Sequence, residues 1–130
     1  MIVIDKTGGI FEVIKELEDR YQIKPKKEFM PDGIPTKYYE FYIAKSYVKE
    51  IIDPQLDTEK WHKHFDSCCE ELKLSNGFIQ THLIKCPYCG GENLEEKNYD
   101  YIENIITEFD YYCKDCKEIV GGWAYGNAHD

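Results

Sequence analysis

The chain has 130 residues, enough for one domain or two small ones, and it carries 25 acidic against 16 basic side chains, a formal net charge of −9. No apolar run approaches the roughly 20 residues that span a bilayer. The start, Met1-Ile-Val-Ile-Asp5, turns acidic too early for a signal peptide. These features disfavour a secreted or membrane-integral protein, so we expect a cytoplasmic one.

The first predicted elements alternate between strand and helix. Residues 1–4 are predicted to form a short strand, and residues 10–21 an amphipathic helix. The helix is favoured because apolar side chains recur at helical spacing: Ile10, Ile14, Leu17 and Tyr21. Residues 37–44, dense in Tyr and Phe, are predicted to form another strand. Residues 46–52 are ambiguous between a strand and a short helix.

A second helix is predicted from Asp53 to Leu74. Asp53-Pro54 supplies a cap and a first-turn proline, and Asn76-Gly77 ends the helix. Its buried face is predicted from spacings of four, three and four residues between Trp61, Phe65, Cys68 and Leu72. Residues 78–84 are predicted to form a strand.

Together these elements predict an α+β domain over residues 1–84. If residues 46–52 form a strand, the order is βαββαβ, that of a ferredoxin-like sandwich; otherwise the class is α+β without a defined topology. The boundary is placed at residue 84 because the charge balance changes there, from a net −2 over residues 1–85 to −7 over residues 86–130.

The predicted second helix also carries histidine and cysteine side chains that suggest chemistry. His62 and His64 are two residues apart, so they point about 200° away from each other on a helix and cannot share an ion. His64 and Cys68 share the apolar face, which favours a satisfied core histidine and a buried thiol. The role of the adjacent Cys69 stays open. We find no catalytic constellation and predict that the protein is not an enzyme.

Four of the six cysteines form two pairs with two residues between partners. Outside an oxidising compartment this spacing indicates metal ligands rather than disulfides. A Cys-x-x-Cys turn lets both thiolates face one ion, and four thiolates at about 2.3 Å make a tetrahedral zinc site. Iron suits the same ligands and is the alternative. We therefore predict a structural Zn²⁺ bound by Cys86, Cys89, Cys113 and Cys116.

The segments around these pairs resemble the zinc-ribbon family. Cys86-Pro-Tyr-Cys89-Gly90 and Cys113-Lys-Asp-Cys116 match its two metal-binding turns, or knuckles, with Lys117 in the usual glycine place of the second. The 23 residues between Cys89 and Cys113 leave room for two strands and a turn. Residues 105–112 alternate with a period near two, and residues 118–125 offer a third strand. The resemblance implies a three-stranded zinc ribbon over residues 85–130, whose metal is structural and has no open position for water.

The charge of this C-terminal part bears on its partners. Residues 86–130 contain ten acidic residues and three lysines. Nucleic-acid affinity is dominated by Lys and Arg contacts to phosphate, so the composition disfavours nucleic acid. An acidic surface instead suits a basic protein partner, which electrostatic steering brings in faster. We therefore predict a basic protein surface as the partner and no membrane; the sequence does not indicate an oligomeric state.

Aromatic side chains crowd the same part, and Trp123 and Tyr125, beside two glycines, are the predicted protein contacts. The predicted function is a non-enzymatic zinc-binding interaction or adapter protein. Small acidic proteins of this kind resemble accessory proteins of bacterial viruses, which implies a target in host transcription or defence machinery. Two alternatives stay open: a nucleic-acid-associated ribbon that stacks bases on aromatic rings, and an acidic DNA mimic that inhibits a DNA-binding partner.

Overall fold

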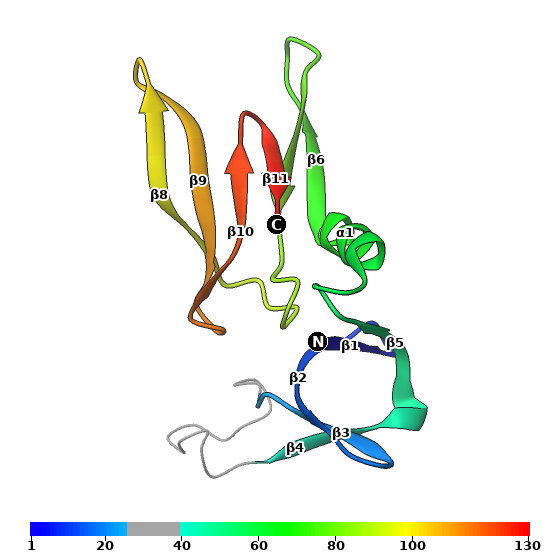
Figure 1. The fold of residues 1–130 in the computed structure, drawn as a ribbon. Coiled ribbons are helices and arrows are strands. Elements are labelled where there is room, and N and C mark those ends of the chain that lie inside the picture. Colours follow the sequence, from blue (N-terminus) through cyan, green and yellow to red (C-terminus); the bar gives the residue numbers. More distant parts are fainter. Residues whose placement is uncertain (26–39) are drawn as a thin grey trace. The chain divides into compact units, whose positions relative to one another are not determined.

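The computed structural model describes residues 1–25 and 40–130 (Figure 1). The chain divides into two compact units, Met1–Thr58 and Glu59–Asp130. Both are built mainly from antiparallel strands, and the described residues contain one α-helix. In the described part of the chain, no helix has the length and apolarity to cross a membrane.

The first unit is a five-stranded antiparallel sheet with the order β4-β3-β2-β1-β5. Its strands are β1 (Ile2–Asp5), β2 (Ile10–Glu16), β3 (Arg20–Ile23), β4 (Phe41–Ala44) and β5 (Val48–Ile52). A one-turn 3₁₀ helix (Lys45–Tyr47) leads from β4 into β5. The buried core of the unit contains Val3, Tyr21, Ile23 and Ile43.

The helix predicted over residues 10–21 is wrong, because this segment forms the β2–β3 hairpin. Ile14, which the helical pattern assigned to the buried face, is 55% exposed. The segment Ile10-Phe11-Glu12-Val13-Ile14 is rich in β-branched and aromatic residues, which favour a pleated surface. Pairing of β2 with both β1 and β3 satisfies its backbone, and this tertiary pairing overrides the helical spacing.

The strands predicted for the first unit are largely confirmed. The first predicted strand is confirmed as β1, and the ambiguous residues 46–52 divide between the 3₁₀ turn and β5. The strand predicted over residues 37–44 is confirmed for Phe41–Ala44, whereas residues 37–39 lie outside the described residues. With β2 and β3 in place of the first helix, the βαββαβ order of a ferredoxin-like sandwich does not occur.

The second unit combines one helix, one separate hairpin and a four-stranded sheet. Helix α1 (Thr58–Ser67) is followed by the hairpin of β6 (Cys69–Lys73) and β7 (Ile79–Leu83). The sheet has the order β11-β10-β9-β8, with β8 (Leu94–Ile102), β9 (Ile105–Cys113), β10 (Glu118–Ala124) and β11 (Asn127–His129). The predicted three strands of the ribbon are therefore joined by a fourth, β11.

The second predicted helix is real but shorter than expected. It ends at Ser67, and Cys69–Lys73 forms strand β6, which pairs with β7. Trp61, Phe65 and Cys68 are buried as predicted, but Leu72 is 52% exposed because it belongs to the hairpin. The strand predicted over residues 78–84 is confirmed as β7.

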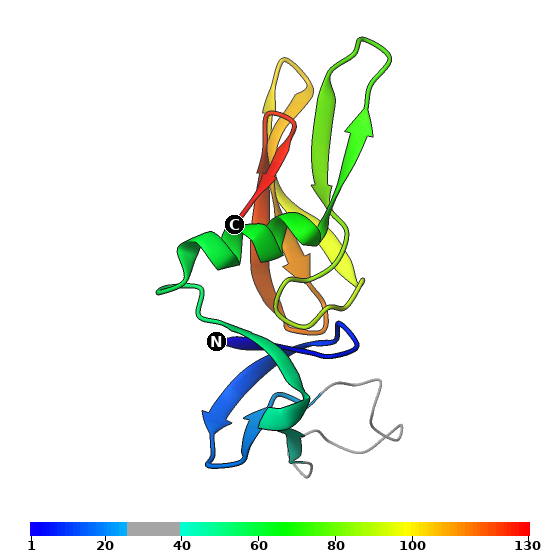
Figure 2. The same ribbon diagram turned by 90° about the vertical axis from the view of Figure 1, so that its right-hand side faces the viewer.

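Helix α1 and the β6–β7 hairpin cover one face of the four-stranded sheet (Figure 2). A Cβ added at Gly121 of β10 would lie 3.1 Å from the Phe65 ring of α1. The Trp123 ring stacks on Phe109 at a centroid distance of 5.0 Å and on His82 of β7 at 5.7 Å. Because these contacts join the helix and hairpin to the cysteine-bearing sheet, the boundary between the compact units falls after Thr58 rather than after residue 84.

Candidate metal centre

The four predicted ligands meet at one point in the second unit. The Sγ atoms of Cys86, Cys89, Cys113 and Cys116 all lie within 4.8 Å of one another. The Cys86–Cys116 and Cys89–Cys113 Sγ distances are 3.8 Å and 3.7 Å. Four thiolates at about 2.3 Å from a tetrahedral Zn²⁺ would be about 3.8 Å apart, which the observed distances match. The cluster can therefore hold a metal ion such as zinc.

The same distances exclude disulfides, because a cystine holds its two sulfurs at about 2.05 Å. All four thiols are free. Backbone amides point at three of the sulfurs: the amides of Tyr88, Gly91 and Cys116 lie 3.4 Å from the Sγ atoms of Cys86, Cys89 and Cys113, respectively. Such amides stabilise the negative charge of a thiolate. A metal cation binds cysteine in this deprotonated form.

The two knuckles share one backbone conformation. The amides of Gly90 and Lys117 each donate a hydrogen bond of 2.8 Å, to the carbonyls of Cys86 and Cys113. Both residues follow the second cysteine of a pair, and both have a positive φ, 72° at Gly90 and 58° at Lys117. Lys117 therefore occupies the glycine place of the second knuckle, as the sequence indicated.

Without a cation, the thiols of this cluster differ in acidity. Hydrogen bonding to Cys116 and Cys86 lowers the pKa of the Cys89 thiol. Hydrogen bonding to Cys86 and Cys89 raises the pKa of the Cys116 thiol. A thiolate at Cys89 thus opposes ionisation of its neighbour, and a divalent cation that removes this repulsion would displace the remaining protons.

No protein-family model, curated protein or solved structure matches the chain. The likeness to zinc ribbons rests on the paired cysteines and the antiparallel strands beside them.

Helix α1 holds the first knuckle from outside the ligand set. His64 is buried, and its Nε2 lies 2.7 Å from the carbonyl oxygen of Pro87. Because a carbonyl oxygen only accepts, Nε2 carries the proton and donates it. The Trp61 ring packs against Tyr88 at a centroid distance of 5.1 Å. These contacts confirm the prediction of a satisfied core histidine.

Substitution of His64 tests this contact. We expect His64→Ala to lower the free energy of unfolding by about 1–3 kcal/mol, because the buried Pro87 carbonyl loses its donor. A chelator competition should also show weaker zinc binding, since the first knuckle is no longer held. His62→Ala is the matched control, because the His62 side chain is 65% exposed and its contact with Asp130 is 3.7 Å long. Equal losses in the two variants would contradict the positioning role of His64.

The remaining thiols lie outside the cluster. Cys68 is fully buried after the end of α1, which confirms the predicted buried thiol. Cys69 begins β6, and its thiol donates to the Phe65 carbonyl at 3.4 Å. Burial, together with the charge of Asp66, raises the pKa of the Cys69 thiol to about 11. Neither residue has the lowered pKa of a reactive cysteine.

The two predicted protein contacts differ in exposure. Trp123 is only 8% exposed, because strand alternation turns it onto the covered face of the sheet beside Phe109. Its ring N–H is buried and has no hydrogen-bond partner among the described residues. Tyr125, in the turn between β10 and β11, is 68% exposed. Of the two, Tyr125 is therefore the residue available for contact.

An acidic feature that sequence reasoning did not locate lies on β8 and β9. Asp100 and Glu108 stand directly opposite each other across the strand pair, beside a bulge in β8. The neighbouring Asp110 accepts a hydrogen bond of 2.8 Å from Asn98. A hollow of about 330 Å³ opens here, lined by Asn98, Tyr99, Asp100, Glu108, Phe109, Asp110, Trp123 and His129. The register between β8 and β9 places these carboxylates together. The sequence pattern of one strand does not reveal its register with another, so this feature could not be predicted.

Proposed function

We propose that the chain is a non-enzymatic, cytoplasmic interaction protein, whose second unit is stabilised by a structural zinc ion and binds a basic surface on another protein. Four thiolates would complete the coordination of the ion, so the zinc would hold the fold and leave no open position for catalysis. The acidic surface of the sheet would contact the partner.

The opposition of Asp100 and Glu108 is the observation that supports this proposal best. Like charges directly opposite on neighbouring strands destabilise a sheet, and local violations of this kind concentrate at functional sites. A Lys or Arg side chain from a partner would relieve the repulsion. Alternation places Glu108 and Asp110 on the face of the sheet away from Phe109 and the covering helix.

The balance of charge in the sheet favours a protein over nucleic acid. Residues 86–130 contribute Lys97, Lys114 and Lys117 as their only basic residues. The ammonium of Lys97 lies 3.9 Å from the centroid of the Tyr112 ring and beside Asp110 in the register, so its charge is partly engaged within the sheet. Phosphate binding depends on several such charges in a row.

A defined probe tests the proposal. The zinc-loaded full chain, titrated with a labelled lysine-rich peptide, should bind more weakly as salt is added, because the attraction is screened. The double variant Asp100→Asn, Glu108→Gln should bind about tenfold more weakly, yet be at least as stable, since it removes a repulsive pair. An affinity capture followed by mass spectrometry then identifies the natural partner. Unchanged peptide binding by the double variant, or a shift of labelled DNA or RNA by the chain alone, would contradict the proposal.

A further inference from the structure

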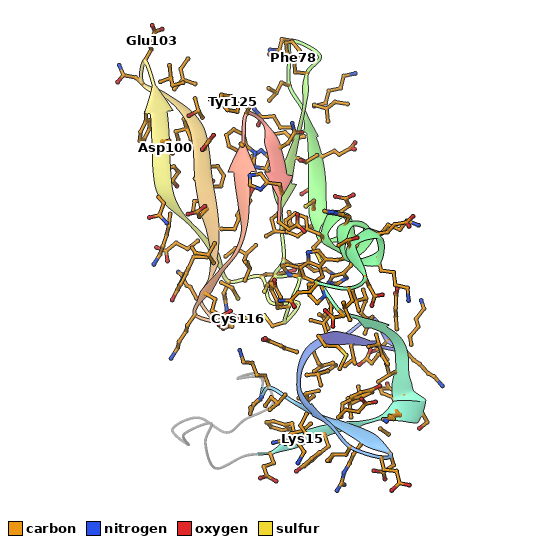
Figure 3. All side chains as sticks on the ribbon, viewed as in Figure 1. Lys15, Phe78, Asp100, Glu103, Cys116 and Tyr125 are labelled. Atoms are coloured by element: carbon orange, nitrogen blue, oxygen red, sulfur yellow. The ribbon has the colours of Figure 1, made fainter. Side chains whose placement is uncertain are left out.

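Three hairpins of the second unit end together, at the end away from the cysteine cluster. Figure 3 shows Phe78, Tyr125 and Glu103 at the tips of the β6–β7, β10–β11 and β8–β9 hairpins, with Cys116 at the opposite end. Apolar side chains at these tips are more than half exposed. We call them the hairpin-tip patch: Phe78, Ile79, Tyr101, Ile102, Ile105 and Tyr125.

Hydrogen bonds fix the β10–β11 turn between the other two hairpins. The amide of Tyr125 donates to the carbonyl of Thr107 on β9 at 2.9 Å. On the other side, the amide of Thr81 on β7 donates to the carbonyl of Gly126 at 2.8 Å. Tyr125 is therefore held on the same rigid framework as the tips beside it. Exposed apolar side chains gathered at one end of a folded unit are candidates for an interaction site.

Tyr125 occupies a backbone position that disfavours its residue type. Ala124 pairs with Asn127, so Tyr125 and Gly126 form a two-residue hairpin turn, with φ of 48° and 96°. Such turns favour Asn, Asp or Gly at their first position, and a bulky residue there is strained by on the order of 1 kcal/mol. Among the described residues, the Tyr125 side chain makes no hydrogen bond or ring contact that offsets this strain. A strained and exposed residue without a compensating contact in the chain is a candidate for contact with another molecule.

The charges around the patch indicate the kind of partner. Glu103 forms the β8–β9 turn, and the opposed pair Asp100 and Glu108 follows it along the same strands. On the β6–β7 hairpin, strand β6 contains two acidic residues, Glu70 and Glu71, and one basic residue, Lys73. A second copy of a chain with net charge −9 would be repelled, whereas an apolar surface bordered by Lys and Arg is complementary.

We infer that the hairpin-tip patch, with Tyr125 at its centre, docks an apolar protein surface bordered by basic side chains. The inference rests on the proposed function and names the part of the acidic unit that touches the partner. Tyr125 supplies a rigid aromatic contact at low cost in side-chain entropy, as at the centres of many interfaces. The neighbouring carboxylates orient the partner.

Three synthetic peptides and two matched substitutions test the inference on the zinc-loaded full chain. One peptide combines Leu and Lys, a second replaces each Leu by Ser, and a third replaces each Lys by Glu. We expect the Leu/Lys peptide to bind about tenfold more tightly than the Ser/Lys peptide, and the Leu/Glu peptide not to bind. Tyr125→Asn should abolish this preference while raising the melting temperature, because Asn suits the turn. Leu56→Asn, which changes an 82% exposed residue of the first unit, should change neither quantity.

The outcomes separate the two proposals. If neither lysine peptide binds, the proposed function fails. If both bind equally, or if Tyr125→Asn retains the preference for Leu, the acidic surface is confirmed as the contact and the hairpin-tip patch is not. Concentration-dependent dimers that Tyr125→Asn dissolves would overturn the inference in favour of a second copy. A fall in melting temperature with Tyr125→Asn would contradict the strain on which the choice of Tyr125 rests.

Discussion

Chelation of the zinc-loaded chain is expected to unfold Glu59–Asp130, and Cys113→Ser is expected to prevent that unit from folding stably. A structural zinc bound by thiolates contributes on the order of 10 kcal/mol, comparable to the whole stability of a small domain. The expected readout is loss of tertiary signals from Trp61 and Trp123, the only two tryptophans, both of which belong to this unit. The first unit contains none of the four cysteines and should keep its strand signals.

Cys69→Ala is the matched control for this prediction. Cys69 has a free thiol outside the cluster. Elemental analysis of the Cys69→Ala variant should therefore still find one metal ion per chain. The same measurement decides between zinc and iron. Retention of the native fold after complete chelation would contradict a structural role for the metal. Equal loss of metal in the Cys69 and Cys113 variants would contradict the assignment of the ligands.

Zinc binding should also depend on pH in a definite direction. Hydrogen bonding within the cluster raises the pKa of the Cys116 thiol, so a proton must leave that thiol when a metal binds. Affinity should therefore fall as the pH is lowered and protons compete with the ion. Calorimetry in buffers of different ionisation enthalpy would measure the protons released. A proton count of zero at neutral pH would show that the thiols had already ionised before binding.

The metal centre could be predicted from sequence because its geometry is local. The spacing of two residues between paired cysteines determines the conformation of each knuckle. Gly90 and Lys117 have positive φ because the chain turns directly after the second cysteine of each pair. Only the meeting of the two knuckles needed tertiary structure, and the strand alternation of residues 105–112 already indicated the hairpin that brings them together.

The errors arose where distant contacts decided the structure. Ile10 to Tyr21 satisfied a helical period and contained β-branched residues at the same time, and pairing with β1 determined the outcome. The sequence predicts an exposed Trp123, whereas the residue is buried, because nothing in its own segment reveals which face of β10 is covered. The boundary predicted at residue 84 lies inside the compact unit Glu59–Asp130, because the contact of Phe65 with Gly121 joins residues far apart in the chain.

The same contact leads to the second large prediction. Phe65 is 2% exposed and joins α1 to the centre of the sheet, so Phe65→Ala should lower the free energy of unfolding of the zinc-loaded chain by about 3–5 kcal/mol. Leu56→Ala, at an 82% exposed site, should change the same quantity very little. A loss below 1 kcal/mol for Phe65→Ala would mean that the helix does not pack on the sheet as described.

A double-mutant cycle isolates the contact itself. A Cβ at Gly121 would lie 3.1 Å from the Phe65 ring and 3.2 Å from the His129 carbonyl, so Gly121→Ala should cost about 1–3 kcal/mol by overpacking. In a Phe65→Leu background that cost should fall by at least about 0.5 kcal/mol, because one of the two obstructions becomes smaller. Gly122→Ala is the control, since its Cβ would meet the His129 ring on the other face and should add to Phe65→Leu without coupling. If Gly121→Ala and Phe65→Leu were simply additive, the ring would not be what excludes a side chain at Gly121.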